Sequence, residues 1–122
     1  MPDPRKVLVV DDSTTVAKQL TKILEESGRY KVVAHATDGL DAIKQFKALK
    51  PDLVCMDVVM PNLDGMQAVR MIKQIDAAAK VVMVSSVGGV AEKVTECLKA
   101  GAVNVVSKPF DAAKVLAVLD AV

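Results

Sequence analysis

Short apolar runs alternate with longer segments of helical periodicity along the whole of this 122-residue sequence. The runs are rich in Val, Leu and Met and have the length of strands. They are residues 7–10, 31–34, 53–56, 80–84 and 103–106. Apolar residues then recur at the spacing of an amphipathic helix, as at Val16, Leu20 and Leu24 after the first run. Strands that are apolar on both faces need helices on both faces. The pattern therefore predicts an α/β fold, a doubly wound five-stranded parallel sheet.

Turn-forming residues separate these segments. Asp12 or Ser13 can cap the first helix, Gly28 can end it, and Pro51 stops the second helix. No linker, low-complexity tract or solenoid repeat interrupts the pattern, and the length fits one compact domain. We therefore expect residues 1–122 to form a single domain.

Composition argues against several classes of protein. The 16 Lys and Arg and 15 Asp and Glu give a net charge of +1, without the basic excess of a nucleic-acid or membrane surface. No apolar run approaches the ~20 residues of a membrane span, and the N-terminus lacks an apolar signal segment. We expect a cytoplasmic protein. Cys55 and Cys97 lie in apolar stretches and suggest neither a disulfide framework nor a zinc site, so we expect reduced core residues.

Chemically active side chains follow four of the five predicted strands. Asp11 and Asp12 follow the first strand, Asp57 the third, Ser85 the fourth and Lys108 the fifth. Parallel strands bring their carboxyl ends to one edge, where open α/β sheets bind ligands. Three crowded carboxylates repel one another unless a cation lies among them, and Mg²⁺ favours such oxygen ligands. A carboxylate can also be the nucleophile of phosphoryl transfer, with a cation and a hydroxyl group stabilising the phosphoryl oxygens.

Four short motifs carry these residues. They are VVDDS at residues 9–13, MDVVMPNLDG at 56–65, VMVSS at 82–86 and KPF at 108–110. Each is weak evidence alone. In this order and spacing they resemble the signature set of response-regulator receiver domains, and the resemblance covers essentially the whole chain. It implies a flavodoxin-like (βα)5 fold with strand order 2-1-3-4-5.

The resemblance also implies roles for single residues. Asp57 is the expected phosphorylation site. Asp12, Asp57 and the main-chain carbonyl of Val59 are expected to coordinate Mg²⁺, with Asp11 acting largely through bound water. Lys108 is expected to contact both Asp57 and the phosphoryl group.

Further roles and two departures follow from the same resemblance. Ser85 matches the Ser or Thr whose hydroxyl turns toward the phosphoryl group, and the Lys108–Pro109 peptide is expected to be cis. Val105 replaces an aromatic residue whose rotamer reports phosphorylation in many receivers. Val59 and Val87 are apolar at two positions bordering the path of attacking water, so we expect a long-lived phosphorylated state.

At the level of function, the resemblance implies a phosphorylation-dependent switch of a chemotaxis-type two-component system. The domain is expected to take a phosphoryl group from a sensor histidine kinase and then to change a face that binds a protein target, such as a flagellar motor component. It has no turnover substrate and catalyses only its own phosphorylation and dephosphorylation, so we do not expect an enzyme. Neither nucleic acid nor membrane is an expected partner.

Three alternatives remain open. The chain can be the receiver of a larger regulator, such as a chemotaxis methylesterase. A haloacid-dehalogenase-type phosphatase also uses a strand-end Asp and Mg²⁺, but its D-x-D motif would replace Asp11-Asp12-Ser13. A flavodoxin would need a Ser/Thr/Gly-rich phosphate loop after the first strand. The only histidine, His35, lies at the end of the second predicted strand, where we expect a structural role away from the pocket.

Overall fold

The computed structural model describes residues 3–58, 60, 62–85 and 91–122, and for residues 91–94 it describes the backbone alone. Within these residues, strands and helices alternate from one end to the other. The strands are β1 (Arg5–Val10), β2 (Tyr30–Ala36), β3 (Leu53–Asp57), β4 (Val81–Ser85) and β5 (Asn104–Ser107). The helices are α1 (Thr14–Glu26), α2 (Gly39–Leu49), α3 (Gly65–Ile75), α4 (Ala91–Ala100) and α5 (Ala112–Asp120).

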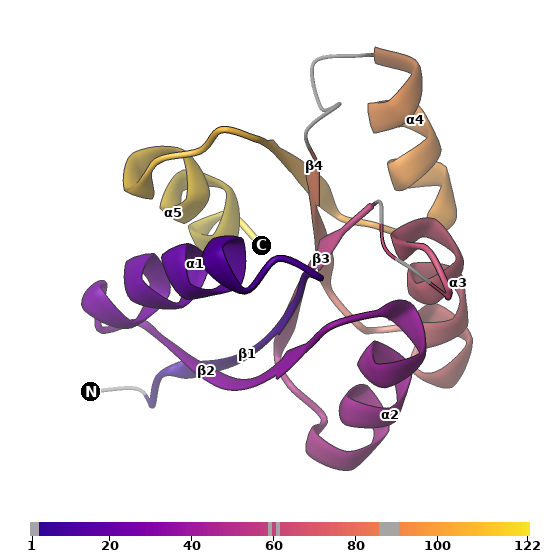
Figure 1. Ribbon diagram of the computed structural model, residues 1–122, viewed down its shortest axis with the longest axis horizontal. Helices are drawn as coiled ribbons and strands as arrows, with labels where there is room; N and C mark the ends of the chain where they lie inside the picture. Colours follow the sequence, from indigo (N-terminus) through magenta and orange to yellow (C-terminus); the bar gives the residue numbers. More distant parts are fainter. Residues whose placement is uncertain (1–2, 59, 61, 86–90) are drawn as a thin grey trace.

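The strands form one parallel sheet in the order β2-β1-β3-β4-β5. Helices α1 and α5 cover one face, and α2, α3 and α4 cover the other (Figure 1). Alternate residues of β1 serve the two cores. Val7 and Val9 pack with α1 and α5, whereas Leu8 and Val10 pack with α2 and α3. The predicted fold class and strand order are confirmed.

Short polar side chains fix where four of the helices begin. Ser13, Asp38, Asp64 and Asp111 are the N-caps of α1, α2, α3 and α5, and each side chain accepts a hydrogen bond from a main-chain N–H in the first turn. Of the two caps considered for α1, Ser13 is therefore the one used. Gly28 follows the end of α1 with a φ of +74°, a conformation that glycine adopts without strain.

Strand β2 contains a bulge next to β1. Val7 pairs with Val32, whereas the following residue, Leu8, pairs with Ala34. Val33 is therefore an extra residue in β2. A bulge of this kind changes which face of the sheet the later side chains of the strand occupy.

Two glycines let the loop between β3 and α3 lie close to its neighbours. The N–H of Gly39 donates to the carbonyl of Leu63 at 3.1 Å, and the N–H of Gly65 donates to the carbonyl of Val58 at 2.8 Å. A Cβ on Gly39 would overlap the carbonyl oxygen of Leu63, and one on Gly65 would overlap that of Asp57. Both positions therefore need glycine to hold the loop beside the end of β3.

Cys55 and Cys97 are buried and form no disulfide, as expected for core residues. Among the described residues, no helix combines the length and the apolar character needed to cross a membrane.

Candidate functional site

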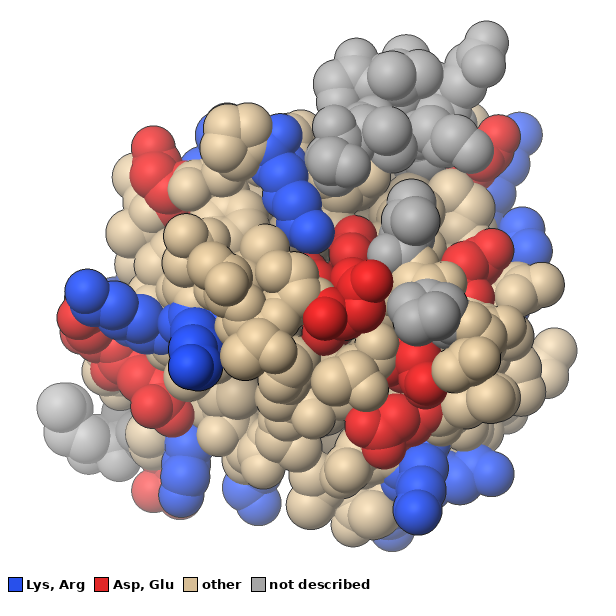
Figure 2. All heavy atoms as spheres, in the orientation of Figure 1, with Lys and Arg blue, Asp and Glu red and all other residues tan. Residues whose placement is uncertain are grey.

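Three carboxylates meet at the carboxyl edge of the sheet. Asp11 and Asp12 directly follow β1, and Asp57 is the last residue of the neighbouring strand β3. Each offers one oxygen, and these three oxygens lie within 4.8 Å of one another. Asp11 and Asp57 are buried, whereas Asp12 is exposed. Figure 2 shows acidic side chains gathered near the middle of the visible face. The prediction that these residues meet is confirmed.

The ammonium group of Lys108 lies among these carboxylates. Its Nζ is 3.1 Å from Oδ2 of Asp11 and 3.5 Å from Oδ1 of Asp57. The lysine follows β5, and its main-chain N–H donates to the carbonyl of Ser85 at 2.9 Å. The Lys108–Pro109 peptide is cis, as the family resemblance implied. The expected contact with Asp57 is present, and the closer contact with Asp11 is an additional feature of the site.

Among the described residues, four hydrogen bonds hold Asp11. Its main-chain N–H donates to the carbonyl of Ala36 at 3.0 Å, and its carbonyl accepts from Nε2 of His35 at 2.8 Å. Its carboxylate accepts from the N–H of Ser13 at 2.8 Å and from Lys108. Both carboxylate oxygens of Asp11 therefore already have donors within the protein.

The expectation that His35 lies away from the pocket is wrong, because its ring contacts the main chain of a pocket residue. The sequence contained a signal that the two residues are neighbours, although not for the hydrogen bond itself. In the strand order 2-1-3-4-5, the end of β2 lies beside the end of β1, so a histidine there lies next to Asp11.

Ser85 ends β4 and is buried at 3% exposure. Asp57 pairs with Val84 across β3 and β4, so Ser85 follows directly after the residue opposite Asp57. The hydroxyl-bearing residue therefore lies at the same edge as the carboxylates, as predicted.

The electrostatic environment of Asp57 favours a bound cation. Burial raises the pKa of Asp57 above its ordinary value of 3.8, and the carboxylates of Asp11 and Asp12 raise it further, while Lys108 lowers it. A hard cation among these oxygen donors would remove the repulsion between them. Mg²⁺ suits the site because it binds through a few carboxylates and keeps part of its water shell. The residues present therefore fit this ion.

Some predicted features lie outside the described residues. These are the main-chain carbonyl of Val59 as a metal ligand and the two apolar positions Val59 and Val87 on the path of water. Val105, at the position of the missing aromatic residue, is partly buried and packs against the core under α2, α3 and α4.

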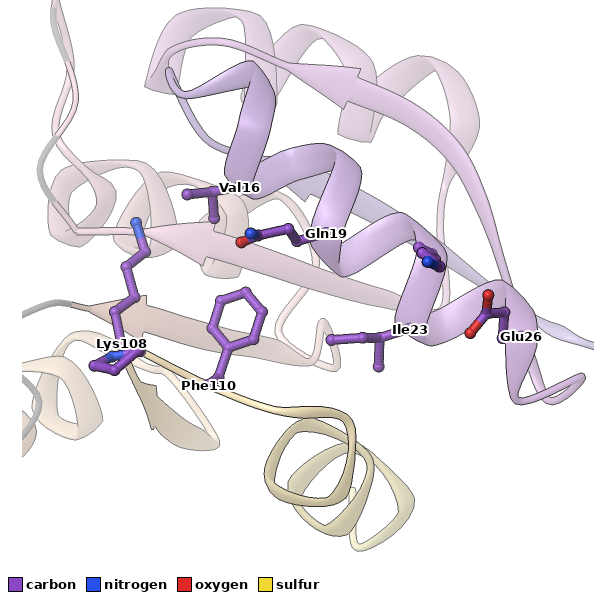
Figure 3. Close-up of a pocket in the computed structure, with 8 residues that line it drawn as sticks. Val16, Gln19, Ile23, Glu26, Lys108 and Phe110 are labelled. Atoms are coloured by element: carbon purple, nitrogen blue, oxygen red, sulfur yellow. The ribbon is translucent and has the colours of Figure 1, made fainter.

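A groove leads from Lys108 along α1. Its lining includes Val16 and Ile23 on α1 and Phe110 just after Lys108. In the close-up, the side chains of Lys108 and Phe110 lie across from those of Val16, Gln19 and Ile23 (Figure 3). Lys108 therefore lines one end of a groove that also contains the apolar side chains of Val16, Ile23 and Phe110.

The fold and its acidic edge are those expected of a response-regulator receiver domain. The sequence profile of that family, the response regulator receiver domain, matches residues 7–120, and the chain belongs to the family. Within it, the chain is similar to chemotaxis regulators of two-component signalling. It is 46% identical over 115 residues to the chemotaxis protein CheY of Treponema pallidum, covering 93% of this chain and 78% of that protein.

Two other similarities bear on the site and on the context of the domain. The structure superposes with a TM-score of 0.91 and 37% identity on a chain of the CheX–CheY–BeF3–Mg²⁺ complex from Borrelia burgdorferi, covering 97% of this chain and 88% of that one. A protein-glutamate methylesterase/protein-glutamine glutaminase of Myxococcus xanthus is 44% identical over 106 residues. That match covers 87% of this chain but only 30% of the relative.

Proposed function

We propose that this protein is a phosphorylation switch in which Asp57 accepts a phosphoryl group from a sensor histidine kinase. One observation carries the proposal. The carboxylate of Asp57 lies at the end of a central strand, 3.5 Å from the ammonium group of Lys108 and beside the carboxylates of Asp11 and Asp12. This arrangement supports Asp57 as the nucleophile, because it places a cation and two further carboxylates beside it, as phosphoryl transfer uses.

Each side chain has its own role in the phosphoryl transfer. An oxygen of Asp57 attacks the phosphorus of the donor, and the bond from phosphorus to the donor's leaving atom breaks with its electrons going to that atom. Lys108, which lies between Asp11 and Asp57, neutralises charge on the phosphoryl oxygens. The hydroxyl of Ser85 donates to one of those oxygens. The product is an aspartyl phosphate, and its hydrolysis returns the carboxylate.

Asp12 and Asp57 would hold Mg²⁺ directly, together with the carbonyl of Val59, and Asp11 would act through water. The hydrogen bonds from Ser13 and Lys108 to Asp11 support this division, because they already use part of the acceptor capacity of both carboxylate oxygens. When bound, the ion supplies positive charge that offsets the charge of the phosphoryl oxygens.

The first experiment tests the acceptor. Incubation with Mg²⁺ and acetyl phosphate should add one phosphoryl group, detected by intact mass, and Asp57→Asn should abolish the addition. Asp64→Asn is a matched control, because Asp64 is an exposed N-cap carboxylate seven residues away. Labelling of the Asp57→Asn protein at the wild-type level would overturn the assignment.

The second experiment separates the metal ligand from the cation. Asp12→Ala should weaken Mg²⁺ binding, because it removes a direct ligand. Lys108→Ala should leave Mg²⁺ binding largely intact, because Lys108 is not a ligand of the ion, yet it should uncouple phosphorylation from the conformational change. Calorimetric titration with Mg²⁺ measures the first effect, and amide shifts with and without beryllofluoride measure the second. Equal weakening of Mg²⁺ binding in both variants would refute the separate roles.

The output of the switch is proposed to be binding of a protein target, with the relative from Borrelia burgdorferi, crystallised in a complex with CheX, as support for this kind of partner. The similarity to the methylesterase supports a second possibility, the same switch as the receiver of a larger regulator. Retrieval of proteins by the phosphorylated form, with Asp57→Asn as control, identifies the target. The full-length gene decides between the two contexts.

A further inference from the structure

The bulge in β2 determines which face of the sheet His35 occupies. After the bulge, Leu8 and Ala34 are partners, and both belong to the core under α2, α3 and α4. The next residue, His35, pairs with Val9, which belongs to the core under α1 and α5. His35 therefore faces α1. Without the extra residue, His35 would pair with Val10 and face α2 instead.

On this face the ring of His35 reaches the segment that joins β1 to α1. Its Nε2 lies 2.8 Å from the main-chain carbonyl oxygen of Asp11. Because a carbonyl oxygen can only accept, Nε2 carries a proton and donates it. The N–H of Asp11 donates in turn to the carbonyl of Ala36 at 3.0 Å. Strand β2 thus holds the main chain of Asp11 at both its N–H and its C=O.

This contact acts on the next residue through covalent geometry. The carbonyl of Asp11 and the nitrogen and Cα of Asp12 lie in one peptide plane. Fixing the carbonyl oxygen therefore fixes the position from which the Asp12 side chain starts. Asp12 is exposed, so its carboxylate lacks the packing that supports Asp57 and Asp11.

We propose that His35 is a positioning residue of the metal site. Its Nε2–H fixes the Asp11–Asp12 peptide and thereby directs the Asp12 carboxylate toward Asp57. The inference rests on the proposed function, because it requires that Mg²⁺ binds at this edge. Partners that orient metal ligands commonly change metal affinity by about 10- to 100-fold, and one acting through the main chain belongs at the lower end.

The test measures Mg²⁺ binding rather than activity. Calorimetric titration of the metal-free protein with Mg²⁺ is compared for wild type, His35→Phe and His35→Gln. Phenylalanine keeps the ring but has no donor, so the dissociation constant should rise about tenfold. The amide of glutamine can donate from nearly the place of Nε2, so His35→Gln should restore most of the affinity.

A control on the same strand separates positioning from general stability. Val32 is partly buried and packs against the core under α1 and α5, but it lies before the bulge. Val32→Ala should lower the melting temperature and leave the Mg²⁺ dissociation constant unchanged. In the metal-free protein, the amide resonances of Asp12 and Ser13 should shift in His35→Phe and not in Val32→Ala.

The outcomes are distinguishable. Unchanged Mg²⁺ affinity in His35→Phe overturns the inference and leaves the proposed function intact. Equal weakening by His35→Phe and His35→Gln also overturns it, as does weakening by Val32→Ala in proportion to its loss of stability. If the wild-type protein binds no Mg²⁺, the proposed metal site fails and the inference fails with it.

Discussion

At the scale of single residues, the buried charge that makes Asp57 a nucleophile also lowers the stability of the fold. Burial is the main cause of its raised pKa, followed by the neighbouring carboxylate of Asp11. The stability that the neutral form contributes is therefore present below the ordinary pKa of 3.8 and is lost as pH rises through the raised value. The ionised form of Asp57 therefore opposes folding of the metal-free protein.

The upward direction of this pKa shift predicts how a neutral side chain at position 57 changes stability. Asp57→Asn keeps the shape of the side chain and removes the charge, so it should raise the melting temperature of the metal-free protein at neutral pH. A gain of ~1 kcal/mol corresponds to about 4 °C for a domain of this size. The gain should shrink as pH falls below the ordinary carboxyl range, and Mg²⁺ should stabilise wild type more than the variant. Thermal melts at several pH values with and without Mg²⁺ measure these effects. A lower melting temperature for Asp57→Asn at neutral pH would contradict the argument.

At the scale of elements, the turn between β2 and α2 supports the loop between β3 and α3. Asp38 caps α2, and its other carboxylate oxygen accepts from the side-chain amide of Asn62 at 2.8 Å. Beside it, the N–H of Gly39 donates to the carbonyl of Leu63. These contacts hold the loop that follows Asp57, so the geometry of the site depends on a helix that contributes no side chain to it.

Gly39→Ala tests this support. Alanine has the higher helix propensity by up to ~1 kcal/mol, so propensity alone would stabilise α2. The new Cβ would overlap the carbonyl oxygen of Leu63, and such overpacking costs about 1–3 kcal/mol. We expect the overlap to dominate and the free energy of unfolding in urea to fall by ~1–2 kcal/mol, with weaker Mg²⁺ binding. Leu40→Ala is the control, because Leu40 is 57% exposed and should change stability by less than ~0.5 kcal/mol. A more stable Gly39→Ala protein would show that propensity outweighs the contact.

The helices and strands also show how much of the fold and of the candidate site could be predicted from the sequence. Alternating apolar runs and helical segments predicted the order of the elements, and parallel strands then required Asp11, Asp57 and Lys108 to share an edge. The contact between His35 and Asp11 depends on the bulge at Val33. The sequence of β2, YKVVAHA, alternates as it would in a regular strand, so the pattern does not mark the change of face. Nor did spacing show that Lys108 lies closer to Asp11 than to Asp57, because side-chain positions inside the pocket decide that.

At the scale of the whole molecule, the two edges of the sheet have different roles. The carboxyl edge carries the candidate site, and the opposite edge ties the two ends of the chain together. There the hydroxyl of Tyr30, at the start of β2, donates to Asp120 at the end of α5 at 2.6 Å. Arg29 contacts the same carboxylate at 2.8 Å, and Arg5 donates to the carbonyl of Val122 at 2.7 Å.

Tyr30→Phe should therefore weaken the fold and leave the chemistry unchanged. Loss of the hydrogen bond to Asp120 should lower stability by ~1 kcal/mol, or about 4 °C in melting temperature, while acetyl phosphate labels Asp57 at the wild-type rate.

Burial is the main factor that raises the pKa of Tyr30, to about 12 from 10.0. The stability that comes from keeping the phenol protonated in the folded state is present below pH 10 and is lost as pH rises toward 12. The Tyr30→Phe protein should not show this loss. Tyr30 is the only tyrosine and the chain has no tryptophan, so phenolate absorbance follows this one group. Titration of the folded protein at the ordinary tyrosine pKa, or slower labelling of Asp57 in Tyr30→Phe, would refute this separation of the two edges.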